Sequence, residues 1–147
     1  MNEFREMRRK RQQLSDEESV GILQRSTSGT LALLGDNGYP YAVSISYVYS
    51  EGKLYFHSAL TGHKVDAIRN YDKASFCVID KDDVQPEKYT TYFRSVIAFG
   101  RIRIIEDEVE KLDIARLLGN RYNPNQDEAP TDKLSQKDTG YMWNKVA

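Results

Sequence analysis

The chain has 147 residues, which predicts one domain over 1–147, because domains cluster at roughly 100–150 residues. Lys and Arg total 21 and Asp and Glu total 22, and the net charge of −1 argues against bulk binding to nucleic acid or to an acidic membrane. A single cysteine, Cys77, excludes an internal disulfide framework and favours a reducing, cytoplasmic setting. No stretch approaches the roughly 20 apolar residues of a membrane span, so we expect a soluble protein.

Residues 1–13 form a basic arm. Its cations are Arg5, Arg8, Arg9, Lys10 and Arg11. Such a run is typical of a solvated segment or of one that lies along a partner, and it is also the composition of a nucleic-acid-binding arm. With only one nearby aromatic residue, Phe4, the nucleic-acid interpretation is the weaker of the two.

The predicted elements follow the arm in chain order. Ser15 and Glu18 have the spacing of a capping box and predict a helix over Asp16–Arg25. The hydrophobic period then changes to two, which predicts strands over 30–34, 41–49 and 54–58, joined by turns at 36–38 and 51–52. A short helix is expected over 63–70, and strands are expected over 74–80 and 90–105. A last helix is expected to begin in the acidic segment 106–110 and to end at residue 121.

Three further expectations concern irregular structure. The polar segment 81–88 is predicted to be a loop, Gly100 to be a bulge, and 122–147 to be an irregular tail. Meandering strands with few helices indicate an α+β, mainly β fold, in which an antiparallel sheet closes as a small barrel.

The strand predicted over 41–49 has one large and one small face. Its small positions include Ala42, Ser44 and Ser46. A face of this kind leaves room for a flat ligand, and it equally suits close packing of a neighbouring helix.

The segment 55–64 combines two histidines, a hydroxyl, a glycine and a lysine where a strand leads into a helix. A helix N-terminus favours an anion, whereas Lys64 in the first turn opposes the helix dipole. A bound phosphate in contact with Lys64 would explain this unfavourable position of the cation. The alternative is that Lys64 is exposed, so that its repulsion by the helix dipole costs little free energy. The spacing is not that of a Walker loop, which disfavours nucleotide hydrolysis. His57 and His63 supply at most two metal ligands, so no metal site is expected.

Two spaced blocks carry a family resemblance. They are Gly38-Tyr39-Pro40-Tyr41-Ala42-Val43-Ser44-Ile45-Ser46-Tyr47, continued by Tyr55-Phe56-His57-Ser58-Ala59 and Gly62-His63-Lys64, and then Phe93-Arg94-Ser95-Val96-Ile97-Ala98-Phe99-Gly100-Arg101-Ile102. Together with Leu14-Ser15-Asp16-Glu17-Glu18 after the arm, they resemble the flavin-binding split-barrel superfamily related to pyridoxamine 5′-phosphate oxidase. Within it, the chain is similar to the 5-nitroimidazole-resistance (Nim-type) flavoproteins.

The resemblance implies a six-stranded antiparallel split barrel with flanking helices that forms a homodimer with FMN at the subunit interface. It places Val43 and Ser44 beside the isoalloxazine and has His57, Ser58 and the adjoining Ala59 border the flavin. It assigns the phosphate to Gly62, His63 and Lys64, and it brings Phe93, Arg94 and Ser95 to the flavin from the partner. His57 stands where Nim-type proteins keep a histidine implicated in redox chemistry, so it is the expected catalytic residue. One departure is the C-terminus, which lacks the Gly-Lys pair that ends the last strand in the family, so a sixth strand is in doubt.

Three functions compete. The first is an FMN-dependent oxidoreductase, of the nitroreductase type, acting on a small aromatic or nitro compound, with His57 exchanging a proton. The second is a flavin-binding protein without turnover, such as a redox-stress protein, and the third is a small nucleic-acid-binding β-barrel. The residues do not separate FMN from haem or a deazaflavin, nor do they identify the substrate or the electron donor.

Overall fold

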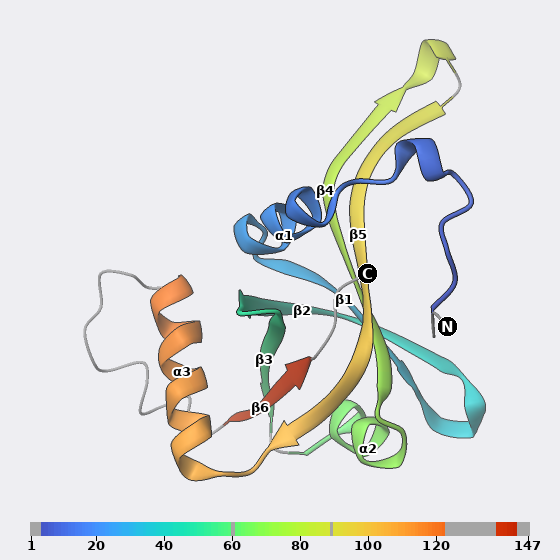
Figure 1. The fold of residues 1–147 in the computed structure, drawn as a ribbon. Helices are drawn as coiled ribbons and strands as arrows, with labels where there is room; N and C mark the ends of the chain where they lie inside the picture. Colours follow the sequence, from blue (N-terminus) through green and yellow to red (C-terminus); the bar gives the residue numbers. More distant parts are fainter. Residues whose placement is uncertain (1–3, 60, 89, 123–137, 144–147) are drawn as a thin grey trace.

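The computed structural model describes residues 4–59, 61–88, 90–122 and 138–143 (Figure 1). The strands are β1 (Ser28–Leu34), β2 (Pro40–Ser50), β3 (Lys53–Ala59), β4 (Lys73–Gln85), β5 (Thr90–Ile105) and β6 (Asp138–Trp143). The α-helices are α1 (Asp16–Arg25), α2 (His63–Asn70) and α3 (Glu108–Tyr122). Short 3₁₀ turns are η1 (Lys10–Gln12), η2 (Asp36–Gly38) and η3 (Pro86–Lys88).

The six strands close into a barrel in the order β1-β2-β3-β6-β5-β4, and all their pairings are antiparallel. This confirms the predicted mainly β split-barrel class. Three helices flank the barrel, and α3 packs against β2, β3 and β6 (Figure 1).

The sixth strand corrects the expectation of an irregular tail over 122–147 in its 138–143 part; residues 123–137 and 144–147 lie outside the described residues. Residues 138–143 pair with β3 along Leu54↔Trp143 to Ala59↔Asp138, and with β5 along Ile102↔Trp143 to Ile105↔Gly140. Edge strands β3 and β5 otherwise present unpaired backbone groups, so pairing rather than a Gly-Lys pattern selects this segment as the closing strand.

Strand β4 extends through the segment predicted to be a loop. Residues 81–85 pair with 90–94 of β5, which leaves only η3 at the turn. Figure 1 shows this part of the β4–β5 ribbon projecting beyond the barrel, where its polar composition does not oppose pairing. The bulge also lies elsewhere than predicted: the register skips Asp80, between Ile79 and Lys81, whereas Gly100 pairs regularly with Ala74.

Two cores lie on the two sides of the β2–β3 wall. The barrel interior holds Phe56 and Phe76 in an edge-to-face pair, and α1 and α2 close it with Ile22, Leu23, Val65, Ala67 and Ile68. The second core lies under α3 and contains Val48, Tyr55, Ile105, Ile114 and Leu118. Both are built from strand positions of alternate parity, as a pleated sheet requires.

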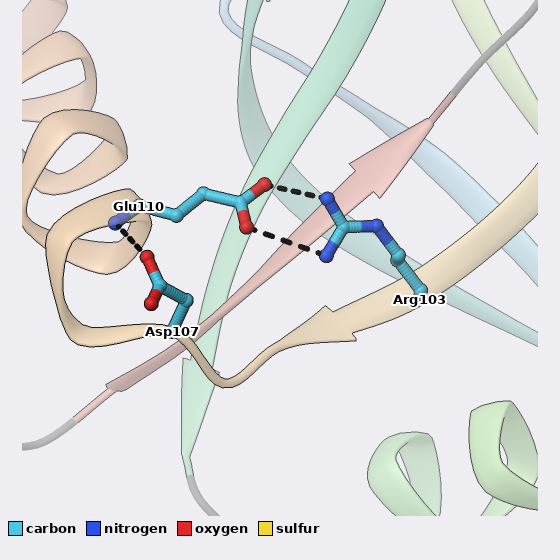
Figure 2. A network of polar contacts seen from close by, with 3 residues as sticks. All are labelled: Arg103, Asp107 and Glu110. Atoms are coloured by element: carbon cyan, nitrogen blue, oxygen red, sulfur yellow. Dashed lines mark hydrogen bonds and ion pairs between the residues drawn. The ribbon is translucent and has the colours of Figure 1, made fainter.

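The ends of two helices are capped by side chains. Ser15 Oγ accepts a hydrogen bond from the Glu18 amide at 3.1 Å, which confirms the predicted start of α1. At α3, Asp107 Oδ2 accepts a hydrogen bond from the Glu110 amide at 2.9 Å, and the Glu110 carboxylate receives the guanidinium of Arg103 from β5 (Figure 2). This network fixes the start of α3 over the second core.

Candidate functional site

The N-terminus of α2 has no side-chain cap, unlike those of α1 and α3. Its N-cap residue is Gly62, whose φ of 130° and ψ of −175° lie in a region that is essentially reserved for glycine. A Cβ at Gly62 would meet nothing within 4 Å, so the glycine is required for its conformation and not for space. Among the described residues, no side chain therefore accepts a hydrogen bond from the first-turn amides, which is the arrangement that receives an anion.

Lys64 lies in the first turn of α2 and is half-buried. Within the part of the chain that the structure describes, no carboxylate lies within 4.0 Å of its ammonium group. A cation at this end of a helix opposes the dipole, and no described partner offsets the repulsion. Lys64 and the uncapped amides thus form one cationic position.

His63, the first residue of α2, lies against the β1–β2 hairpin. Its ring packs on Tyr41 with the centroids 4.0 Å apart and the planes inclined by 35°. Its Nε2 lies 3.9 Å from Asp36 Oδ2. The structure therefore brings the end of the β3–α2 connection to the start of β2, although 22 positions of sequence separate His63 from Tyr41.

The residues predicted to border a flavin fall on two faces of the sheet, because successive side chains of a strand point to opposite sides. Val43 packs against the barrel core and Ser58 is buried, so both side chains belong to the inner face. Ser44 is exposed and His57 is half-buried on the outer face. Ser58 Oγ donates to the carbonyl oxygen of Ala59 at 3.0 Å. A ligand on the outer face can therefore meet the side chains of Ser44 and His57, and only the backbone of Val43 and Ser58.

The barrel splits at this point. The β2–β3 ladder runs from Ser50↔Lys53 to Tyr47↔Phe56 and ends there, after which β2 pairs only with β1 and β3 only with β6. Opposite His57 on β6 is Gly140, which carries no side chain. On β6, the strand that neighbours His57, no side chain therefore stands at the opposite position.

Phe93, Arg94 and Ser95, which are predicted to reach the flavin from a partner, lie on β5, where it pairs with β4. Phe93 and Arg94 pair with Asp82 and Lys81 of the projecting ribbon, and Ser95 pairs with Ile79. Arg94 and Ser95 are exposed, whereas the side chain of Phe93 lies outside the described residues. The structure does not bring this block to Ser44 or His57 within one chain.

An apolar outer face extends over β4 and β5. Ile79, Ile97 and Phe99 are 56%, 45% and 38% exposed, and the register places all three on the same side. Phe4 of the basic arm stacks on Phe99 with ring centroids 5.6 Å apart. Cys77, opposite Ile97, is partly buried on this face, and burial raises the pKa of its thiol.

Tyr55 is the buried titratable residue nearest in sequence to His57, on the same face of β3. Burial, followed by the charges of Glu110 and Glu51, raises the pKa of its hydroxyl, and Arg103 acts in the opposite direction. Tyr55 therefore stays protonated at neutral pH beneath α3.

Sequence reasoning missed the partners of His63. Tyr41, Asp36 and Gly35 reach the α2 N-terminus only because the hairpin folds back, and no spacing in the sequence indicates that contact. The position of Gly140 opposite His57 likewise depends on the pairing of β6 with β3, which no local pattern encodes.

The described residues offer neither a metal site nor a membrane-spanning helix. No group of three His, Cys, Asp or Glu residues in the described ranges is arranged to hold a metal ion. Among the described helices, none combines the length and apolarity needed to cross a membrane.

Comparisons with known proteins agree with this fold. The family model for pyridoxamine 5′-phosphate oxidase matches residues 15–143. A search of curated proteins finds no match. Among solved structures, the fold is similar to that of a candidate 5-nitroimidazole antibiotic resistance protein from Bacteroides thetaiotaomicron, with 19% identity, a TM-score of 0.73, and 90% of this chain and 80% of that chain covered.

Two further structures share the fold. The flavocytochrome Anf3 from Azotobacter vinelandii has 18% identity and a TM-score of 0.75, with 92% of this chain and 68% of that chain covered. An FAD and heme binding protein from Mycobacterium smegmatis has 22% identity and a TM-score of 0.71, with 90% and 67% covered. At these identities the likeness establishes the fold, a split barrel also used by proteins named for flavin binding. The family model spans most of the barrel from α1 to β6, and the chain belongs to the pyridoxamine 5′-phosphate oxidase family.

Proposed function

We propose that the protein binds FMN and is an oxidoreductase that acts on a small aromatic or nitro compound. The observation that carries the proposal is the cationic N-terminus of α2, where Gly62 leaves the amides uncapped and Lys64 has no described counter-ion. A phosphate monoester fits this donor set in both charge and hydrogen bonding.

The outer face of β2 suits the rest of the cofactor. Ala42 and Ser44 are exposed and small, and they leave room for a flat ring system on this face. FMN supplies hydride or electron transfer when bound, and the protein supplies position and charge. In this proposal Lys64 holds the phosphate, Ser44 offers a hydroxyl at the edge of the ring system, and the His57 imidazole donates or accepts a proton beside the substrate.

The site is completed by a second copy of the chain. The apolar outer face of β4 and β5 would be buried in a homodimer, which removes exposed apolar surface from water. Phe93, Arg94 and Ser95, which lie away from Ser44 within one chain, would then approach the flavin from the partner. FMN is favoured over FAD by the single cationic position at α2, and the FAD and heme binding neighbour makes FAD and haem the alternatives to test.

The first test is the absorbance spectrum of the purified protein, followed by mass identification of the released cofactor. Oxidised-flavin absorbance with released FMN is expected; haem, FAD or no chromophore after incubation with FMN would contradict the assignment. Lys64→Met should weaken FMN binding by about tenfold or more while sparing riboflavin, which lacks the phosphate. Arg69→Met on the same helix is the matched control, since Arg69 lies in the last turn.

Turnover separates the enzyme from a flavin-binding protein without activity. Steady-state oxidation of NADH or NADPH with a nitroaromatic acceptor is expected, and His57→Ala should lower its rate and alter its pH profile. FMN binding without any such turnover would favour the non-catalytic function of the same fold. Salt-dependent binding of nucleic acid by a colourless protein would favour the third function.

A further inference from the structure

We propose that the imidazole of His63 is a positioning group that latches the first turn of α2 to the β1–β2 hairpin, and that it is not itself a phosphate ligand. This inference rests on the proposed function, because it assigns different roles to two adjacent residues of the same anion site.

The ring contact is the principal connection. His63 and Tyr41 have their ring centroids 4.0 Å apart, which is close packing of two flat groups. Gly35 admits the imidazole: a Cβ at Gly35 would lie 3.2 Å from His63 Nε2 and 2.9 Å from the carbonyl oxygen of Tyr39. The backbone amide of Gly35 donates a hydrogen bond to the carbonyl oxygen of Tyr39 at 2.7 Å. This bond holds the hairpin backbone in place where the His63 ring approaches it.

Asp36 makes a direct phosphate contact by His63 unfavourable. Its Oδ2 lies 3.9 Å from His63 Nε2, and an anion that approached this nitrogen would meet a carboxylate of like charge. The side chains of His63 and Asp36 are 40% and 79% exposed, so an ion pair between them, which needs a protonated imidazole, would contribute little to the latch. Packing on Tyr41 is therefore the main cause of the ring's position.

The first turn of α2 needs such a latch because Gly62, at its start, does little to hold the backbone in one conformation. Gly62 neither caps the helix with a side chain nor restricts its own backbone rotation. His63 is the first helical residue and Lys64 the second, so holding the His63 ring on Tyr41 fixes the direction of the first-turn amides and of Lys64. His63 acts on the anion through these groups.

Dissociation constants for FMN and riboflavin, measured by fluorescence quenching, test the assignment. His63→Ala should weaken FMN binding by about tenfold and change riboflavin binding by less than about threefold. His63→Phe, which keeps a flat ring on Tyr41 without an ionisable nitrogen, should restore FMN binding to within about threefold of wild type. Tyr41→Ala should resemble His63→Ala, and the double variant should be no worse than either single variant.

The contrary results are distinct. If His63→Phe is as weak as His63→Ala while wild type prefers FMN to riboflavin, the imidazole nitrogen is itself a ligand and the inference is overturned. A loss of more than about threefold in Asp36→Asn would also overturn it, since the ion pair would then be the latch. If wild type shows no preference for FMN over riboflavin, the proposed function fails instead.

Discussion

Arg25 donates two hydrogen bonds to Asp80, from Nε to Oδ1 at 2.9 Å and from Nη2 to Oδ2 at 2.7 Å. Arg25 ends α1, and Asp80 is the residue that the β4–β5 register skips. This bidentate pair therefore connects the C-terminal end of α1 to the bulge in β4, where the β4–β5 ribbon leaves the barrel. The hydrogen bond from Arg25 is the main cause that lowers the pKa of Asp80 below 3.8; the charges of Arg25 and Arg94 add to it and burial opposes it.

The first prediction follows from the sign of that shift. A carboxylate with a lower pKa in the folded than in the unfolded state contributes stability above its unfolded pKa, and the contribution is lost as the pH falls through the folded pKa. Arg25→Gln should be less stable than wild type at pH 7, and the difference should shrink as the pH falls below 3.8. Urea denaturation across this range checks it, with Arg69→Gln as control; a difference that persists in acid would contradict the role of Asp80.

The second prediction concerns the cap of α3 in Figure 2. Asp107→Ala removes the acceptor of the Glu110 amide and should lower the free energy of unfolding by about 1 kcal/mol. Asp107→Asn keeps an acceptor and should lose only a fraction of that. Asp113→Ala, at an exposed position of the same helix, is the control in urea denaturation. Equal effects of Asp107→Ala and Asp113→Ala would mean that the cap adds nothing.

The third prediction concerns backbone conformation at Gly62. A φ of 130° is strained for any residue with a Cβ, so Gly62→Ala should lower the free energy of unfolding by about 1–3 kcal/mol or move the first turn of α2. Either outcome should weaken FMN binding. Gly21→Ala, in the interior of α1, should instead be neutral or stabilising, because a Cβ there meets only the flexible Arg25 side chain at 3.6 Å. Unchanged stability and FMN affinity in Gly62→Ala would refute the conformational requirement.

The fourth prediction uses the thiol on the outer face. Because burial raises the pKa of Cys77 above 9.0, little thiolate is present at neutral pH. Alkylation of native protein by iodoacetamide at pH 7.5 should be slower than alkylation of the urea-unfolded chain, and it should accelerate as the pH rises toward 9. Mass spectrometry gives both rates. Equal rates in the native and unfolded chains would show that the face does not shield Cys77.

The fifth prediction tests the face as an interface. Ile97→Asp places a charge among Ile79, Phe99 and Cys77, and burying that charge without a partner is costly. The variant should shift from dimer to monomer in analytical ultracentrifugation and should bind FMN more weakly. Val109→Asp alters an exposed apolar residue of α3, away from this face, and serves as control. A wild-type monomer that binds FMN tightly would remove the interface from the site.

Local signals in the sequence were enough to predict most elements. The boundaries of α1, α2 and β5 match the expectations, because they depend on short-range patterns such as the capping box of Ser15 and Glu18. The fold class and the family were also predicted correctly from the spaced motifs.

Long-range relationships were not predictable in the same way. Residues 81–85 and 138–143 carry no strong strand pattern and are strands because each has a partner to pair with. The contact between His63 and Tyr41 depends on how the hairpin folds back, which no local pattern encodes. The assignment of Val43, Ser44, His57, Ser58, Ala59, Phe93, Arg94 and Ser95 to a flavin stays a prediction, although strand parity now separates side chains from backbone within it.

The closure of the barrel by β6 imposes an order on biosynthesis. Strands β3 and β5 leave the ribosome well before residues 138–143, and until then each has an edge with unpaired amides and carbonyls. The outer edges of β3 and β5 therefore lack these backbone partners until residues 138–143 have been added to the chain. A peptide with the sequence of β6 would find these edges free only before the chain's own β6 has closed the barrel.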